Sequence, residues 1–166
     1  MDRAQNLDTA CFVPEGGTVW LSTMNVSDVM TKNPVTISPD ATLREALETM
    51  GRVGCHHLPV ISADKHLTGI ITARDCRLAL RLPDILREYW QDERLANHIL
   101  VKAVMTPAPM IVEPDASADE AVRLMLVNYV SCLPVMRGET LVGIVTTSDL
   151  LLALMNLLRS HPPEDG

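Results

Sequence analysis

Two similar segments of the chain each place a threonine three residues before an aspartate. The first reads "GIITARDCRLAL" from residue 69, and the second reads "GIVTTSDLLLAL" from residue 143. The pairs are Thr72 with Asp75, and Thr146 with Asp149. Each pair follows a short apolar run and precedes a helical pattern, so each threonine is predicted to stand at a helix N-terminus.

This spacing permits two roles. A threonine at the N-cap with an acidic residue three positions later is the capping-box pattern, here with Asp in place of Glu. The same site also suits a phosphorylated sugar, because free N–H groups at a helix N-terminus attract phosphate. The Thr hydroxyl can donate to such a ligand, and an ionised Asp can accept hydrogen bonds from a ribose diol. The residues alone leave both roles open.

The neighbouring residues differ between the two motifs. Arg74 stands inside the first motif and carries a guanidinium fork suited to phosphate. The second motif offers only Thr147 and Ser148 at the corresponding places. We therefore expect two unlike sites, of which the first prefers a phosphorylated ligand.

The two motifs belong to a longer internal duplication. "VSDVMTKNPVTISPDATLREALETM" aligns with "VKAVMTPAPMIVEPDASADEAVRLM", and "HHLPVI" aligns with "SCLPVM"; these segments are residues 26–50, 101–125, 56–61 and 131–136. The match extends over a unit of roughly 55 residues, too long for a small solenoid repeat. Two packed domains are therefore favoured over a repeat array.

Each copy is predicted to fold as β-α-β-β-α, which gives an α/β (α+β) arrangement with helices covering small sheets. In the first copy, β-forming residues predict a strand at 35–37 and helical spacing predicts a helix from Thr42, with Thr42 and Glu45 as a capping box. A strand, a hairpin turn, a second strand and a final helix follow. The corresponding elements of the second copy are expected at 109–113, 117–127, 133–136, 141–145 and 147–158.

Three segments lie outside the two copies, which we place at 26–80 and 101–158. Residues 1–25 form an N-terminal extension, residues 81–100 separate the copies and residues 159–166 form a C-terminal tail. Pro83 and Asp84 resemble a helix start, followed by the apolar Ile85, Leu86, Tyr89 and Trp90. This stretch is either a linker helix packed on the body or a contact for another chain.

Composition narrows the function. The net charge of −7 lacks the basic character expected of a general nucleic-acid binder. Cys11, Cys55, Cys76 and Cys132 form no C-x-x-C pair, which indicates free thiols in a reducing cytoplasm. The longest apolar run is too short to span a bilayer. A cytoplasmic, soluble protein is predicted.

Neither a metal site nor an enzyme is predicted. His56 and His57 are adjacent in an expected strand and would point to opposite faces, so they do not readily share a metal ion. The second copy has Ser131 and Cys132 at these positions. The sequence shows no Ser/His/Asp or Cys/His arrangement, and "GIVTTSD" matches neither a nucleophile elbow nor a P-loop.

The ordered set of motifs resembles a tandem pair of cystathionine-β-synthase (CBS) domains, the arrangement called a Bateman module. The resemblance covers about residues 26–80 and 101–154. It implies two repeats packed about a pseudo-two-fold axis, with two clefts that bind AMP, ADP, ATP or S-adenosylmethionine. It also implies a homodimer that regulates an attached or partner protein. No cofactor is required.

The resemblance also assigns site residues. The T-x-x-D segment would contact ribose and phosphate, and the first strand with the "LPV" segment would form the adenine face. With the positions adjoining the motif, the first-copy set is Pro34, Val35, His57, Pro59, Thr72, Arg74 and Asp75. The second-copy set is Pro109, Met110, Cys132, Pro134, Thr146, Ser148 and Asp149.

Three hypotheses of function follow. The chain is a sensor that binds an adenosine derivative, a ligand-free dimerisation or interaction module whose T-x-x-D motifs only cap helices, or an enzyme. A catalytic constellation would be needed for the third, and the sequence offers none. Apolar positions on the last helix, Leu150, Leu151, Leu154, Leu157 and Leu158, favour a homodimer.

Overall fold

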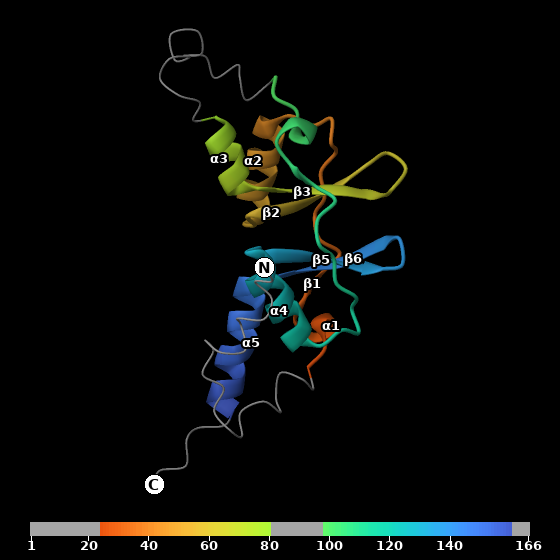
Figure 1. The fold of residues 1–166 in the computed structure, drawn as a ribbon. Coiled ribbons are helices and arrows are strands. Elements are labelled where there is room, and N and C mark those ends of the chain that lie inside the picture. Colours follow the sequence, from red (N-terminus) through yellow and green to blue (C-terminus); the bar gives the residue numbers. More distant parts are fainter. Residues whose placement is uncertain (1–23, 81–97, 161–166) are drawn as a thin grey trace, which may run out of the picture. The chain divides into compact units, whose positions relative to one another are not determined.

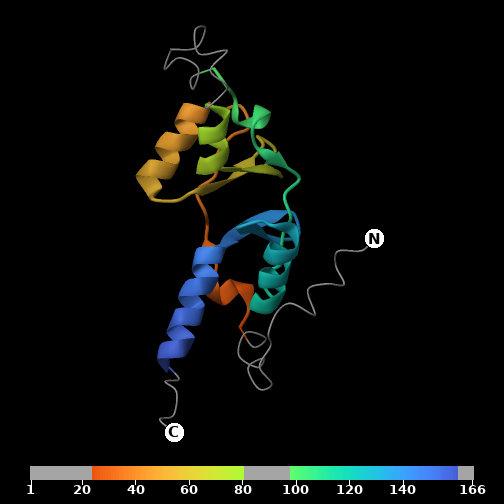
Figure 2. The ribbon, with the colours of Figure 1, turned by 60° about the vertical axis from the view of Figure 1, so that its left-hand side comes forward.

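The computed structural model describes residues 24–80 and 98–160 (Figures 1 and 2). The chain divides into two compact units, each with a three-stranded sheet and covering helices. The repeat 1 unit contains residues 33–110 with 138–141, and the repeat 2 unit contains the other described residues. The helix start expected at Pro83 and Asp84 and most of the N-terminal extension lie outside the described residues.

The repeat 1 unit is built around the sheet β2-β3-β4, in which both strand pairs are antiparallel. Helices α2 and α3 pack on one another. The element bounds are α2 Leu43–Val53, β2 His57–Ile61, β3 Leu67–Thr72, α3 Ala73–Ala79, the 3-10 helix η4 Val101–Ala103 and β4 Thr106–Pro107.

The repeat 2 unit contains the helices α1, α4 and α5 and the sheet β1-β6-β5, apart from the first two residues of β6. Its element bounds are α1 Val26–Val29, β1 Thr31–Lys32, α4 Ala118–Asn128, β5 Cys132–Arg137, β6 Thr140–Thr146 and α5 Thr147–Ser160. The order of helices and strands therefore follows the predicted β-α-β-β-α pattern in both copies, except at the first strand.

The predicted first strands, 35–37 and 109–113, are reduced to single bridges. Ile37 pairs with Val60 and Val112 pairs with Val135, both in parallel. Prolines flank both stretches and supply no N–H to a ladder. The residues just before them, Asn33 and Ala108, turn through positive φ angles of 49° and 44°. The prolines and the turns together prevent a longer strand at either place.

The segment that leads into each repeat folds with the other repeat. Residues 24–32 belong to the repeat 2 unit, where the Val26 N–H donates to the Ala116 carbonyl at 2.8 Å. Residues 98–107 belong to the repeat 1 unit, where the Val101 N–H donates to the Ala41 carbonyl at 2.8 Å. Figure 1 shows the red α1 beside the teal α4. The sequence alignment gives no sign of this exchange.

A glycine receives each leading segment. β4 pairs with β3 so that Gly69 lies opposite Pro107, and β1 pairs with β6 so that Lys32 lies opposite Gly143. A Cβ at Gly69 would lie 2.5 Å from the Met105 sulfur and 2.9 Å from the Thr106 carbonyl oxygen. The repeated glycine is thus explained by close backbone approach.

Each unit has its own apolar core. Helix α2 contributes Leu43, Ala46 and Met50 to the repeat 1 core, and Val101 of the leading segment is fully buried with them. Val26 takes the equivalent place in the repeat 2 core, beside Ala121 and Met125 of α4. The leading segments therefore supply core side chains as well as hydrogen bonds.

We predict that Gly69→Ala lowers the free energy of unfolding by about 1–3 kcal/mol, because the new methyl group meets a backbone oxygen that cannot move aside. The control is Gly51→Ala inside α2, where an added Cβ has no neighbouring atom within 4 Å. That change should stabilise the helix by about 0.5–1 kcal/mol. Thermal melting of both variants provides the measurement, and a Gly69→Ala protein as stable as the parent would contradict the prediction.

Candidate functional site

The first T-x-x-D motif forms a reciprocal capping box at the start of α3. The Thr72 backbone N–H and hydroxyl both donate to Asp75 Oδ2, at 3.0 and 2.7 Å. The Asp75 N–H donates in return to Thr72 Oγ1 at 3.1 Å. Both side chains are half-buried. The capping role that the sequence left open is therefore present in the structure.

The second motif repeats this geometry at the start of α5. The Thr146 N–H and hydroxyl donate to Asp149 Oδ2 at 2.8 and 2.7 Å. The Asp149 N–H donates to Thr146 Oγ1 at 3.3 Å. Because the geometry is the same in the two repeats, the same aspartate oxygen, Oδ1, is left in each motif without a hydrogen bond from a described residue.

These bonds limit what the motif can offer a ligand. A hydroxyl has one hydrogen, and in both motifs that hydrogen is directed to the aspartate. The expected donation from Thr72 or Thr146 to phosphate would therefore require breaking the box. Within the described residues, every hydrogen bond that the carboxylates of Asp75 and Asp149 accept is accepted by Oδ2. Oδ1 is the oxygen left to accept a ligand hydroxyl.

The segment that pairs with the motif-bearing strand positions each motif. In the β2–β3 pair, His57 lies directly opposite Thr72, and the Ala73 N–H donates to the His56 carbonyl at 2.9 Å. The Thr147 N–H donates likewise to the Ser131 carbonyl at 3.0 Å. The residues before "LPV" in each repeat thus hold the first turn of α3 and of α5.

The first-copy site residues all belong to the repeat 1 unit. The Ile37 N–H donates to the Pro59 carbonyl at 3.0 Å, which places the segment containing Pro34 and Val35 along β2. The second-copy set is divided. Pro109 and Met110 belong to the repeat 1 unit, whereas the residues from Cys132 to Asp149 in this set belong to the repeat 2 unit.

Accessibility separates the predicted residues further. Pro59 and Pro134 are fully buried and Cys132 is nearly so, which gives them packing roles. Val35 and Met110 are about two-fifths exposed. Arg74 and Ser148 are also exposed, so both can reach a ligand from solvent.

Cys76 directly follows Asp75 but has no reactive character. Its side chain is buried in the repeat 1 core. Burial, with a smaller contribution from the neighbouring Asp75 charge, raises the pKa of the thiol to about 11. The thiol is therefore neutral at physiological pH and is a poor nucleophile.

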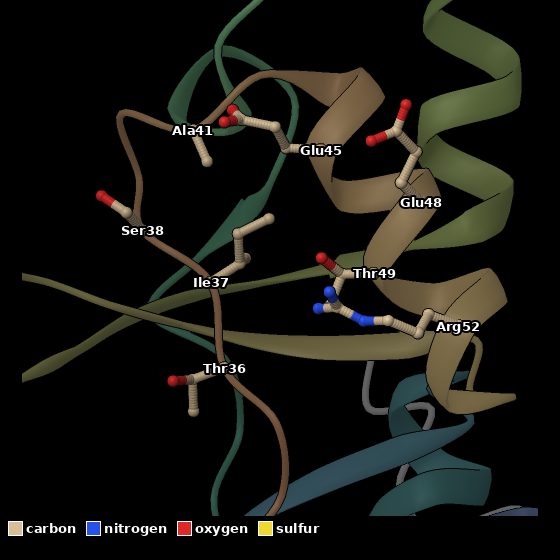
Figure 3. A pocket seen from close by; sticks show the side chains of 8 residues that line it. All are labelled: Thr36, Ile37, Ser38, Ala41, Glu45, Glu48, Thr49 and Arg52. Atoms are coloured by element: carbon tan, nitrogen blue, oxygen red, sulfur yellow. The ribbon is translucent and has the colours of Figure 1, made fainter.

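A cleft of about 560 Å³ beside α2 was not predicted from the sequence (Figure 3). We call it the α2 cleft. It is lined by Thr36, Ile37, Ser38, Ala41, Glu45, Glu48, Thr49 and Arg52. Its signal in the sequence is the polar spacing of Glu45, Glu48, Thr49 and Arg52, which by itself is indistinguishable from an ordinary solvated helix face.

Comparison with known proteins identifies the family. The family model for the CBS domain matches residues 26–82 and 101–156. The chain belongs to the CBS domain family. Its two CBS repeats correspond to the two copies recognised in the sequence, and the mixed helix–strand fold agrees with that family.

Individual relatives extend the comparison. A CBS domain-containing protein of Dictyostelium discoideum is 40% identical over 142 residues, which cover 84% of this chain and 97% of the relative. CBSX2 solved in complex with AMP is 27% identical, with a TM-score of 0.64 over 81% of this chain and 98% of that chain.

A third similar protein was solved with other adenosine derivatives. The CBS domain pair of protein MJ0100, in complex with methylthioadenosine and S-adenosyl-L-methionine, is 25% identical with a TM-score of 0.67. It aligns with 79% of this chain, and 99% of that chain is covered. CBS pairs similar to this chain therefore bind AMP and S-adenosylmethionine.

Two features are absent from residues 24–80 and 98–160. No group of three or more His, Cys, Asp or Glu side chains in these ranges is arranged to hold a metal ion. Among the helices of these same ranges, none is both long and apolar enough to cross a membrane.

We predict that Asp75→Asn and Asp149→Asn separate capping from ligand binding. The asparagine oxygen can keep the cap, while its amide group replaces Oδ1 as the atom facing a ligand. If Oδ1 accepts a ribose hydroxyl, AMP affinity should fall by about 1–3 kcal/mol at the altered site. Calorimetry measures the affinity, and melting measures the modest loss of stability expected for a weakened cap. Unchanged affinity together with a lowered melting temperature would assign the motif to capping alone.

Proposed function

We propose that this CBS pair is a non-catalytic regulatory module that binds an adenosine-containing ligand, namely AMP, ADP, ATP or S-adenosylmethionine. The observation that carries the proposal is the geometry of the two capping boxes. In each, one carboxylate oxygen holds the helix start while the other has no hydrogen bond within the described chain. The ligands solved with CBSX2 and protein MJ0100 support the same class.

The accessible site residues keep the ligand-binding roles expected from the sequence. In the proposal, Asp75 and Asp149 accept ribose hydroxyls, and the segments containing Pro34, Val35, Pro109 and Met110 face the adenine. The exposed Arg74 contacts phosphate at the first site, where Ser148 at the second carries no charge. The first site should therefore favour nucleotides.

The alternative is a ligand-free interaction module. It is favoured by the hydrogen bonding of both capping boxes, because the hydroxyls of Thr72 and Thr146 already donate to the aspartates. On this reading nothing in the motif needs a ligand. Binding measurements decide between the two functions.

A second copy of the chain is the proposed partner of the repeat 2 unit. Helices α4 and α5 pack together and leave large apolar side chains in solvent. The most exposed are Leu126, Tyr129, Leu151, Leu152 and Leu158, each more than half accessible. Such a surface on one unit is typical of an interaction site. A regulated protein is the other proposed partner.

The proposed setting is the cytoplasm, where adenine nucleotides occur. Cys55, Cys76 and Cys132 are free thiols in the structure. Free, mostly buried thiols are typical of proteins kept in a reducing compartment.

We predict that AMP, ADP, ATP or S-adenosylmethionine raises the melting temperature in proportion to the logarithm of its concentration. At 100 times the dissociation constant, binding adds about 2.7 kcal/mol to the free energy of unfolding. Arg74→Ala should weaken nucleotide binding more than adenosine binding. Arg77→Ala, which removes another exposed charge one turn later, is the control. A melting temperature that no ligand raises would contradict the first expectation. Equal losses of affinity for nucleotide and for adenosine in Arg74→Ala would contradict the second.

We also predict a homodimer at tens of micromolar. Light scattering should give twice the chain mass of 18.2 kDa. Leu151→Lys and Leu158→Lys place charges in the exposed face of α5 and should shift the protein toward monomer. Their control is Leu78→Lys on α3, which is 57% exposed but lies in the other unit. A monomer mass for the parent protein would exclude the dimer.

A further inference from the structure

The α2 cleft lies wholly within the repeat 1 unit and contains no residue of a T-x-x-D motif. Its volume of about 560 Å³ is within the range of small-molecule sites. One wall is the face of α2 that carries residues 45, 48, 49 and 52, whose helical spacing puts them on the same side. The other wall is the segment 36–41.

Arg52 is the cation inside this cleft. Figure 3 shows Arg52 and Thr49 reaching from α2 toward the segment around Ile37. The Arg52 side chain has no ion pair or hydrogen bond with any described residue, whereas the Arg123 side chain on α4 is paired with Asp119 at 2.9 Å. The guanidinium fork and the Thr49 hydroxyl are therefore left for an oxyanion.

Thr36 adds backbone groups to the same cleft. Ile37 directs its N–H to Pro59 and its carbonyl to the Ile61 N–H, so its backbone faces β2. The N–H and carbonyl of Thr36, the residue before it, then face away from β2 at the outer edge of the sheet. Thr36 makes no hydrogen bond within the described chain, so this edge can also contact a polar ligand.

Two carboxylates lie at the rim. Glu45 Oε2 accepts hydrogen bonds from the Thr42 N–H at 2.7 Å and from its hydroxyl at 2.9 Å, which lower the pKa of Glu45 and keep it ionised. Glu48 is exposed and forms no ion pair with a described residue. The residues that line the cleft therefore carry two negative charges, on Glu45 and Glu48, and one positive charge, on Arg52. A purely anionic ligand is therefore repelled, and a ligand that also carries an ammonium group is attracted.

The second repeat shows that the fold does not require these polar groups. In the alignment of the copies, Ile111, Leu124 and Val127 stand where the first repeat has Thr36, Thr49 and Arg52. Helices α2 and α4 nevertheless have the same length of 11 residues. Ile111 and Val127 are nearly half exposed in their own unit. The polar lining is thus particular to the first repeat.

We propose that the α2 cleft binds a small zwitterion of the amino-acid class, with its carboxylate on Arg52 and Thr49 and its ammonium group facing Glu48. This site is separate from the adenosine sites proposed above and shares no residue with them. A CBS pair built this way would respond to two chemically different ligands.

The test uses L-serine as the probe and the full chain labelled with ¹⁵N. L-serine should shift the resonances of Thr36, Thr49 and Arg52 in a saturable way. The singly charged analogues are 3-hydroxypropionate, which lacks the amine, and ethanolamine, which lacks the carboxylate. Each should bind at least about tenfold more weakly than L-serine, as expected for the loss of one charge-assisted contact.

Two variants introduce the residues of the second repeat. Arg52→Val and Thr49→Leu should each weaken L-serine binding, Arg52→Val by about tenfold or more. Arg123→Ala, which removes an exposed arginine of α4, should leave the affinity unchanged. Absence of saturable shifts, equal binding of 3-hydroxypropionate, or unchanged affinity in Arg52→Val would each overturn the proposal. AMP melting shifts are read separately, so failure of one site does not imply failure of the other.

Discussion

Each unit is closed by a leading segment that lies directly against the backbone of a glycine. At Gly69 there is no room for a Cβ, because Met105 and the Thr106 carbonyl occupy that space. Gly143 meets Met30 in the same way. The contact lets Val101 and Val26 enter the two cores, and β3 and β6 end at the threonines of the motifs. The position of both motifs therefore depends on this close approach.

The T-x-x-D motif joins stability and recognition in one carboxylate. Oδ2 of Asp75 holds the first turn of α3, which fixes where Oδ1 stands. A side chain fixed in this way loses little freedom when it binds a ligand hydroxyl. Capping and binding are thus compatible roles for different oxygens of one residue, although the threonine hydroxyl cannot serve both at once.

Duplication gave two similar scaffolds whose exposed faces have diverged. The face of α2 in the first repeat carries Thr49 and Arg52, whereas α4 carries Leu124 and Val127. The buried positions keep their apolar character, since Ala46 and Met50 correspond to Ala121 and Met125. Core packing constrains the inner face and leaves the outer face free to change. The polar face suits a small ligand, and the apolar face suits a protein surface.

The sequence by itself determined the family, the order of elements and the capping box of Thr42 with Glu45, because these depend on local spacing and on repetition along the chain. It also located the T-x-x-D helix starts. The first strands were predicted too long, since local β-propensity at Val35 and Ile37 ignores the turn at Asn33. Only the tertiary structure decided that residues 24–32 fold with the second repeat, that Asp75 uses Oδ2 for the cap, and that the polar face of α2 borders a cleft. These features arise from contacts between segments distant in sequence, which no local pattern encodes.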